Sequence, residues 1–292
     1  MIIFSPLYAD DLQFAGMHDS GKTTFIAAIW DYVNSEKKGK KLILNTLANS
    51  ENQYLDSIRS EWLKCQKVTR TNLGKIENVR MNLLKSENQE NVLIEIPDMS
   101  GELFAEHFQS REWSIEYGNV INEVSGILIF INPEDTKNRT NFLADSNALI
   151  EALGGEPEGN EDIEFASWNE EMTSNQVKLV ETLQFIYSRS NSEFPIKISV
   201  IVSRWDLLES AHGETPESWI QLQMPLFFQY LKCNPVSFKS AFYGVSAQGG
   251  NYDEPTELEK LRELEAYDRP KVKIDGNFIN DLAEPVIWIT QD

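Results

Sequence analysis

Apolar and polar residues along this chain follow, in turn, the periods typical of strands and helices. Residues 12–15 are mostly apolar and predict a short buried strand. Over residues 24–30 the apolar residues recur at helical spacing, among them Phe25, Ala28 and Ile29. A polar helix is expected over about 49–66, where the apolar residues on one face are Tyr54, Ile58 and Trp62.

A hairpin is predicted next. Val79, Met81 and Leu83 alternate with polar residues, as in a half-exposed strand, and residues 92–96 form a second apolar stretch. The turn-like segment 86–90 between them is short, so the two strands are expected to pair antiparallel.

The later part of the chain alternates between helical and strand patterns. Helices are expected near 103–124 and 219–231, the second interrupted by Pro225. Further strands are expected at 127–131, 196–202 and, as the last one, 240–246. Strands alternating with helices indicate an α/β fold of three layers, with a mostly parallel sheet and one antiparallel edge strand.

Composition narrows the classes of protein. The 292 residues suffice for one large domain or two small ones, and the formal net charge of −20 argues against nucleic acid or an anionic membrane as the main partner. The one basic cluster, residues 37–41, is expected to be a solvated helix end and loop.

Other features point to a cytoplasmic protein. The two cysteines, Cys65 and Cys233, suggest no disulfide framework, and we find neither a signal peptide nor an apolar run long enough for membrane insertion.

We expect a single domain over residues 1–292 with two additions. The acidic segment at about 135–175 is interpreted as an insertion, either a solvated loop or a partner-docking element. Residues at about 250–292 are interpreted as a C-terminal extension.

The loop after the first predicted strand carries the strongest chemical signal. Residues 16–23 have the spacing G-x-x-x-x-G-K-[ST] of a phosphate-binding P-loop, between a strand and a helix as this motif requires. Its backbone N–H groups and Lys22 would hold phosphates, and the Thr23 hydroxyl would bind Mg²⁺. The candidate residues of this loop are Gly16, His18, Asp19, Ser20, Gly21, Lys22, Thr23 and Thr24.

A second element, D-x-x-G, follows the strand at 92–96. Asp98 at the strand end would hold the Mg²⁺ shell, and the Gly101 N–H would reach the γ-phosphate.

Two further elements would recognise the base. Residues 203–206 resemble the guanine-recognising N-K-x-D element, in which the Asp206 carboxylate would accept hydrogen bonds from guanine N1–H and N2–H₂. Adenine offers neither donor, so the carboxylate would stay unpaired against ATP. Arg204 would lie over the base. Ser246 and Ala247 resemble the S-A-K element, where a backbone N–H meets guanine O6.

These four elements, in this order, resemble the translation-factor-like clade of P-loop GTPases, which includes Ras-like and signal-recognition-receptor β-like proteins. Within that clade the chain resembles the bacterial double-GTPase group of conflict and defence systems, through residues 20–30, 97–102 and 281–288. The resemblance implies GTP/GDP and Mg²⁺ as cofactors and a protein effector or a second GTPase subunit as partner.

The chain departs from the GTPase pattern at five positions, one of which, Arg204 in place of the Lys of N-K-x-D, is a milder change. Ser203 replaces the Asn that ties the base loop to the P-loop, which would weaken guanine affinity. Glu102 stands where Ras-like enzymes carry a water-orienting Gln, so it is a general base, a repulsive charge or a first-turn helix acid. His18 would crowd an incoming arginine finger, and Gln248 replaces the Lys of S-A-K.

The switch threonine is Thr71 or Thr69, with Thr71 preferred because it lies nearer the following strand. Thr71 would complete the Mg²⁺ and γ-phosphate contacts, so the candidate catalytic residues are Lys22, Thr71 and Glu102, and the candidate metal ligands are Thr23, Asp98 and Thr71.

The sequence thus predicts a guanine-nucleotide switch with slow Mg²⁺-dependent GTP hydrolysis. One alternative is a non-hydrolysing interaction module with a GTPase-like fold, and another is an ATP-dependent P-loop phosphotransferase.

Overall fold

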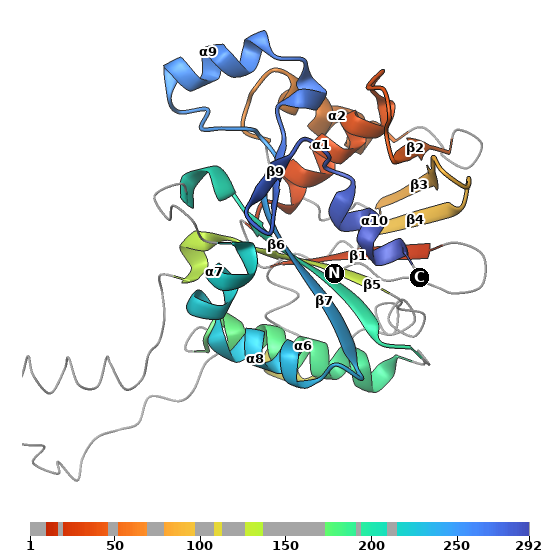
Figure 1. The fold of residues 1–292 in the computed structure, drawn as a ribbon, viewed down its shortest axis with the longest axis vertical. Coiled ribbons are helices and arrows are strands. Elements are labelled where there is room, and N and C mark those ends of the chain that lie inside the picture. The colour runs from red at the N-terminus through yellow and green to blue at the C-terminus, as the bar shows by residue number, and fades with distance from the viewer. Residues whose placement is uncertain are drawn as a thin grey trace, which may run out of the picture.

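A single mixed sheet organises the protein (Figure 1). The computed structural model describes residues 10–16, 20–45, 52–68, 79–96, 108–112, 126–136, 173–190, 194–208 and 215–291. Within them nine strands lie in the order β2-β3-β4-β1-β5-β6-β7-β8-β9. Their bounds are β1 Asp10–Gly16, β2 Leu42–Leu44, β3 Val79–Lys85, β4 Asn91–Ile96, β5 Gly126–Ile131, β6 Ile196–Ser203, β7 Phe238–Ser246, β8 Lys271–Ile274 and β9 Asn277–Ile279.

The centre of the sheet is parallel and its two flanks are antiparallel. Strands β4, β1, β5, β6 and β7 run in one direction. The predicted hairpin is present as β3 and β4, with Met81 opposite Ile94. The expected α/β class, with a mostly parallel sheet and an antiparallel edge, is therefore confirmed.

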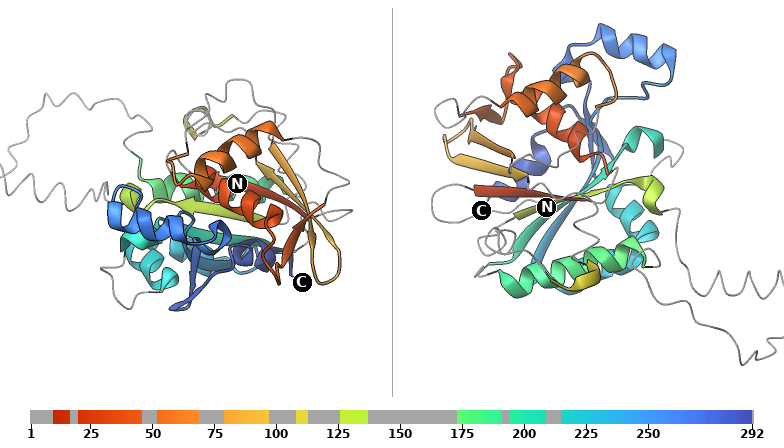
Figure 2. Two further views of the ribbon diagram at one scale, coloured as in Figure 1. Left: turned by 90° about the horizontal axis from the view of Figure 1, so that it is seen from above. Right: turned by 180° about the vertical axis from the view of Figure 1, so that it is seen from behind.

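Helices cover both faces of the sheet (Figure 2). Among the described residues, the helices with eight or more residues are α1 Lys22–Asn34, α2 Gln53–Leu63, α6 Asn175–Arg189, α7 Pro216–Gln223, α8 Pro225–Cys233 and α9 Pro255–Glu263, and a shorter one, α10, spans Glu284–Thr290. Alternate residues of β5 separate the two layers: Leu128 and Phe130 pack with α1 and α10, whereas Ile127 and Ile129 pack with α6, α7 and α8.

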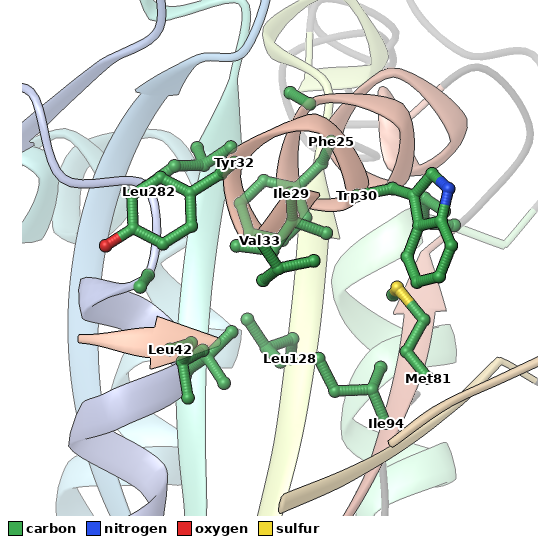
Figure 3. Packing of buried hydrophobic residues seen from close by; sticks show 14 of the residues in the cluster. Phe25, Ile29, Trp30, Tyr32, Val33, Leu42, Met81, Ile94, Leu128 and Leu282 are labelled. Carbon is green, nitrogen blue, oxygen red and sulfur yellow. The ribbon is translucent and has the colours of Figure 1, made fainter. Parts of the chain in front are cut away.

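The core under α1 fixes the start of that helix against the sheet. Figure 3 shows Phe25, Ile29 and Val33 on the side of α1 that faces Leu128 and Ile94. All five side chains are buried, so α1 is held in place over β1, β4 and β5 by apolar packing.

Several element predictions are confirmed, with shifted ends. The helix predicted over 49–66 is α2, Gln53–Leu63. The region 219–231 is divided at Pro225, since α7 ends at Gln223 and α8 begins at Pro225. The helix predicted over 103–124 and the acidic insertion lie mostly outside the described residues.

The prediction of the last strand is wrong, and that of a solvated basic loop at 37–41 holds only in part. The strand over 240–246 is not the last, because β8 pairs with β7 and β9 pairs with β8. The basic cluster at 37–41 is also not simply solvated. Lys37 Nζ donates to the carbonyl oxygens of Asn280 at 2.7 Å and Tyr267 at 3.2 Å. Lys41 forms an ion pair with Glu284.

The C-terminal extension is therefore built into the core. Lys37 and Lys41 hold it beside the end of α1, and Ser199 of β6 donates to the carbonyl oxygen of Pro285 in α10 at 2.7 Å. No helix in the described ranges is long and apolar enough to cross a membrane.

Candidate functional site

The loop between β1 and α1 ends in the geometry that an anion site needs. Gly16 is the last residue of β1, and α1 begins at Lys22. Gly21 lies between them in the left-handed region, at φ +81°, which favours glycine. The N–H of Phe25 donates to the Gly21 carbonyl oxygen at 3.0 Å. Because the first N–H groups of a helix have no acceptor within it, this end of α1 favours a negative group.

A pocket of about 580 Å³ lies beside this loop, where the carboxyl ends of β5, β6 and β7 meet. Nine of the predicted nucleotide-binding residues line it: Ser20, Gly21, Lys22, Thr23, Thr24, Ser203, Arg204, Asp206 and Ala247. The fold thus brings the P-loop and both base elements to one cavity. Such a crevice, outside the carboxyl ends of parallel strands, is the usual ligand position in open α/β sheets.

Lys22, at the start of α1, lines this pocket and brings a positive charge to its P-loop end. Its Nζ donates to the hydroxyl of Ser20 at 3.1 Å, and Ser20 is buried. The ammonium group is thus kept close to the helix N-terminus, where it would meet phosphate oxygens. Thr23 lines the same wall and presents a hydroxyl oxygen of the kind that Mg²⁺ binds.

Ser203 connects three parts of the site. Its hydroxyl donates to the carbonyl oxygen of Ile131 at 3.1 Å, which links the end of β6 to the end of β5. It also packs against the P-loop, since a Cβ built on Gly21 would lie 3.0 Å from the Ser203 Cβ. Ser203 therefore contacts the P-loop by close packing rather than through a longer amide side chain.

Asp206 is positioned by its buried neighbour Trp205. The Trp205 ring lies edge-on to Trp219 of α7 at 6.5 Å between centroids, and it also packs over Gly244 of β7. Arg204, at φ +52°, turns the chain from β6 into the short 3-10 helix Trp205–Leu208. This turn places the Asp206 carboxylate at the pocket wall.

Arg204 is held by a residue that the sequence analysis missed. Its Nη1 pairs with Glu134 Oε2 at 3.0 Å, and both side chains line the pocket. The Glu134 N–H donates to the side chain of Asn132 at 3.1 Å. The strand at 127–131 was predicted, and the carboxyl end of β5 adjoins the site. The position of Glu134 just after that strand was therefore a signal that could have identified it.

The sequence analysis also did not predict the residues on the far wall of the pocket. Lys67 and Val68, after α2, line it together with the loop after β7. Lys67 Nζ and Asp253 Oδ2 form an ion pair of 2.8 Å across these two segments. Tyr252 lines the same wall, and burial raises the pKa of its phenol, as do the nearby Cys65 thiol and the Asp206 charge.

The remaining predicted residues do not all reach this pocket. Ser246 is buried and is not among the lining residues, and its hydroxyl has no hydrogen-bond partner within the described part of the chain. Gly16 ends β1. The other predicted site residues lie outside the described residues: His18, Asp19, Thr69, Thr71, Asp98, Gly101 and Glu102.

No group of three or more His, Cys, Asp or Glu suited to a metal ion occurs among the described residues. Mg²⁺ at nucleotide sites needs few protein ligands, because substrate phosphates and water supply the others. The Thr23 hydroxyl in the pocket fits that arrangement.

Comparison with known proteins gives a family match over most of the chain. The model of the family described as Double-GTPase 1 matches residues 13–289. A search of curated proteins finds no match. Among solved structures, Roco2 RocCORdC of Methanosarcina barkeri bound to GDP is similar at 12% identity and a TM-score of 0.30. The match covers 87% of this chain and 49% of that chain.

Proposed function

The chain belongs to the Double-GTPase 1 family of P-loop GTPases, and on that premise we propose that it is a guanine-nucleotide switch. It binds GTP and GDP with Mg²⁺, hydrolyses GTP slowly and controls a protein partner. One observation carries the proposal: residues of the P-loop and of both base elements line a single pocket.

The phosphate end of the pocket would hold the charged part of the nucleotide. The N-terminus of α1 and Lys22 stabilise the phosphates, because both present positive charge to the same end of the cavity. Thr23, with Asp98 and Thr71, would hold Mg²⁺, and the bound ion would supply positive charge beside the phosphates. His18 and Asp19 complete the P-loop contacts.

The base end would discriminate guanine from adenine. The Asp206 carboxylate accepts from guanine N1–H and N2–H₂, and the N–H of Ala247 donates to O6. With adenine in the pocket the carboxylate would lose its donors and part of its hydration, at a cost on the order of 3 kcal/mol. Arg204, oriented by Glu134, covers the base.

Hydrolysis and switching belong to residues around the γ-phosphate. Glu102 acts on the attacking water, and its charge and the bulk of His18 keep the reaction slow. Loss of the γ-phosphate releases Thr71 and Gly101, which changes the surface over about 101–117.

The partner is a protein effector or a second GTPase subunit in a bacterial defence system. Nucleic acid is not expected as a partner, given the net charge of −20, and the setting is cytoplasmic.

Titration with fluorescent GDP, GTP and ATP analogues tests the binding site. We expect guanine nucleotides to bind, ATP to bind far more weakly, and Lys22→Ala to abolish binding. Lys38→Ala is the matched control, because Lys38 is an exposed lysine in the loop after α1. Equal or tighter ATP binding would refute the guanine assignment, and unchanged binding by Lys22→Ala would refute the phosphate site.

Turnover assays separate a GTPase from a non-hydrolysing module. We expect multiple turnovers of GTP by the purified protein, lost in Asp98→Ala. Tight GTP binding without phosphate release would favour the interaction module, in which nucleotide is a structural ligand.

A further inference from the structure

The loop that follows β7 is fixed by a contact that no GTPase motif specifies. The indole N–H of Trp62, near the end of α2, donates to the carbonyl oxygen of Ala247 at 3.1 Å. Trp62 does not itself line the pocket, whereas Ala247 does. A buried side chain of α2 thus holds the backbone of a pocket residue.

Trp62 is itself held firmly. Its side chain is fully buried, and the Arg269 guanidinium lies over its ring at 5.7 Å from the centroid. Arg269 Nη1 also donates to the carbonyl oxygen of Leu63 at 3.1 Å. The indole therefore keeps one orientation, with its N–H directed at Ala247.

The same loop is clamped on its other side. Gly249 has φ +87°, and a Cβ there would lie 2.3 Å from the carbonyl oxygen of Arg269. The loop therefore packs directly on the Arg269 backbone, while Trp62 binds it two residues earlier. The Gly249 N–H also donates to the Ser246 carbonyl oxygen at 3.3 Å, and that carbonyl shares its peptide unit with the Ala247 N–H. Trp62 binds the carbonyl of the next peptide unit, so the backbone is held on both sides of the Ala247 Cα.

We propose that Trp62 is a specificity-determining positioning residue, which orients Ala247 so that its N–H recognises a 6-oxo group on the bound purine. This inference rests on the proposed function, because it takes a guanine nucleotide to be the ligand of the pocket. The contact acts through preorganisation: a backbone already fixed loses less freedom when the base binds. Loss of the Trp62 contact should therefore weaken the binding of nucleotides through the 6-oxo group that the Ala247 N–H contacts, and not through other groups of the base.

Trp62→Phe tests the proposal, because it removes the indole N–H and keeps an aromatic ring in the core. Trp30→Phe is the matched control: Trp30 is also buried, and its indole N–H donates to Asp56 of the same helix α2 at 2.9 Å, away from the pocket. Affinities are measured for GDP, for 6-thio-GDP, whose sulfur is a weak acceptor, and for IDP, which lacks the 2-amino group.

We expect Trp62→Phe to bind GDP about three- to tenfold more weakly, the loss typical of one hydrogen bond. Its affinity for 6-thio-GDP should fall less, so that the preference for GDP over 6-thio-GDP shrinks. The preference for GDP over IDP should stay as in the wild type, because that preference reports on Asp206. Trp30→Phe should leave both preferences unchanged.

A proportional loss for all three nucleotides, or no loss at all, would overturn the positioning role. If the wild type failed to bind GDP, the proposed function would fail instead, so the two failures are distinguishable. If Trp62→Phe does not fold, Trp62 can be replaced by a tryptophan analogue in which sulfur takes the place of the indole N–H. This analogue keeps the size of the ring and removes only the hydrogen-bond donor, so it gives the same test.

Discussion

The hydroxyl of Ser203 donates to the carbonyl oxygen of Ile131 at 3.1 Å, across the parallel strands β6 and β5. The resemblance of residues 203–206 to the N-K-x-D element would put Ser203 at the position of an Asn that ties the base loop to the P-loop. Here the shorter side chain binds the neighbouring strand and lies directly against Gly21. Ser203 thus contacts both the end of β5 and the P-loop.

Ser203→Ala should weaken both the fold and the site. It leaves the buried carbonyl of Ile131 without this donor, so the free energy of unfolding should fall by about 1–2 kcal/mol. Urea denaturation measures that loss, and GDP titration should show weaker binding. Ser60→Ala, on the exposed side of α2, is the control and should change neither quantity. Full stability in Ser203→Ala would mean that the hydrogen bond contributes nothing.

Asp206→Asn should change the preferred base. The amide keeps one acceptor but can donate to the 2-oxo group of xanthine, which a carboxylate repels. We expect guanine affinity to fall by about 10- to 100-fold, as for loss of a charge-assisted hydrogen bond, and xanthine affinity to rise. Competition between GDP and XDP for a fluorescent nucleotide measures both. An unaltered preference for guanine would place the base elsewhere.

Glu134→Gln should affect binding more than stability. The ion pair with Arg204 is largely exposed, and such pairs contribute about 0–1 kcal/mol to folding. The melting temperature should therefore hardly change, whereas Arg204 loses its anchor and nucleotide affinity should drop about twofold to fivefold. Glu217→Gln is a matched control, since its pair with Lys232 at 2.6 Å is similarly exposed and lies away from the pocket. Equal affinities for the two variants would show that Glu134 does not position Arg204.

Gly244→Ala should displace Trp205 and, through it, the part of the pocket that would recognise the base. The added Cβ would lie 2.3 Å from Cδ2 of Trp205, so the indole must move, and Asp206 follows it in the chain. Overpacking of this kind costs about 1–3 kcal/mol of stability. The preference for GDP over ADP should shrink, because the phosphate end is untouched. Tryptophan fluorescence and paired GDP and ADP titrations check this, and an intact preference would separate Trp205 from the position of Asp206.

The buried phenol of Tyr243 should make the free energy of unfolding decrease at alkaline pH. Burial raises the pKa of its phenol above the ordinary 10.0, with smaller contributions from Glu284 and Asp275. The unfolded chain therefore loses this proton first, and the stabilisation present below pH 10 declines as pH rises toward the folded-state pKa. One such group contributes at most about 1.4 kcal/mol per pH unit. Urea denaturation between pH 9 and 11 should give a shallower decline for Tyr243→Phe, and an equal slope would contradict the assignment.

Structural features that are set by residues close together in the chain could be predicted from the sequence. The strand, loop and helix around Lys22 are encoded within one short segment, and the α/β class follows from the alternation of patterns. The family resemblance, carried by motifs of a few residues, is confirmed by the match over residues 13–289.

Contacts between distant segments could not be predicted in this way. Glu134 and Trp62 carry no motif, and their partners Arg204 and Ala247 lie far along the chain. The strand β8 was missed because its four residues, Lys-Val-Lys-Ile, are too few for periodicity to stand out. Lys37 looked solvated because its acceptors, the carbonyls of Tyr267 and Asn280, have no sequence signature.

The attachment of Lys37 and Lys41 to the C-terminal segment has a consequence for biosynthesis. During translation, the apolar underside of α1 emerges long before Leu282 and Val286, which share its core. Part of this apolar core therefore stays exposed to solvent until those late residues leave the ribosome. Chaperones that shield such half-built intermediates should matter more for this protein than its sheet order alone would suggest.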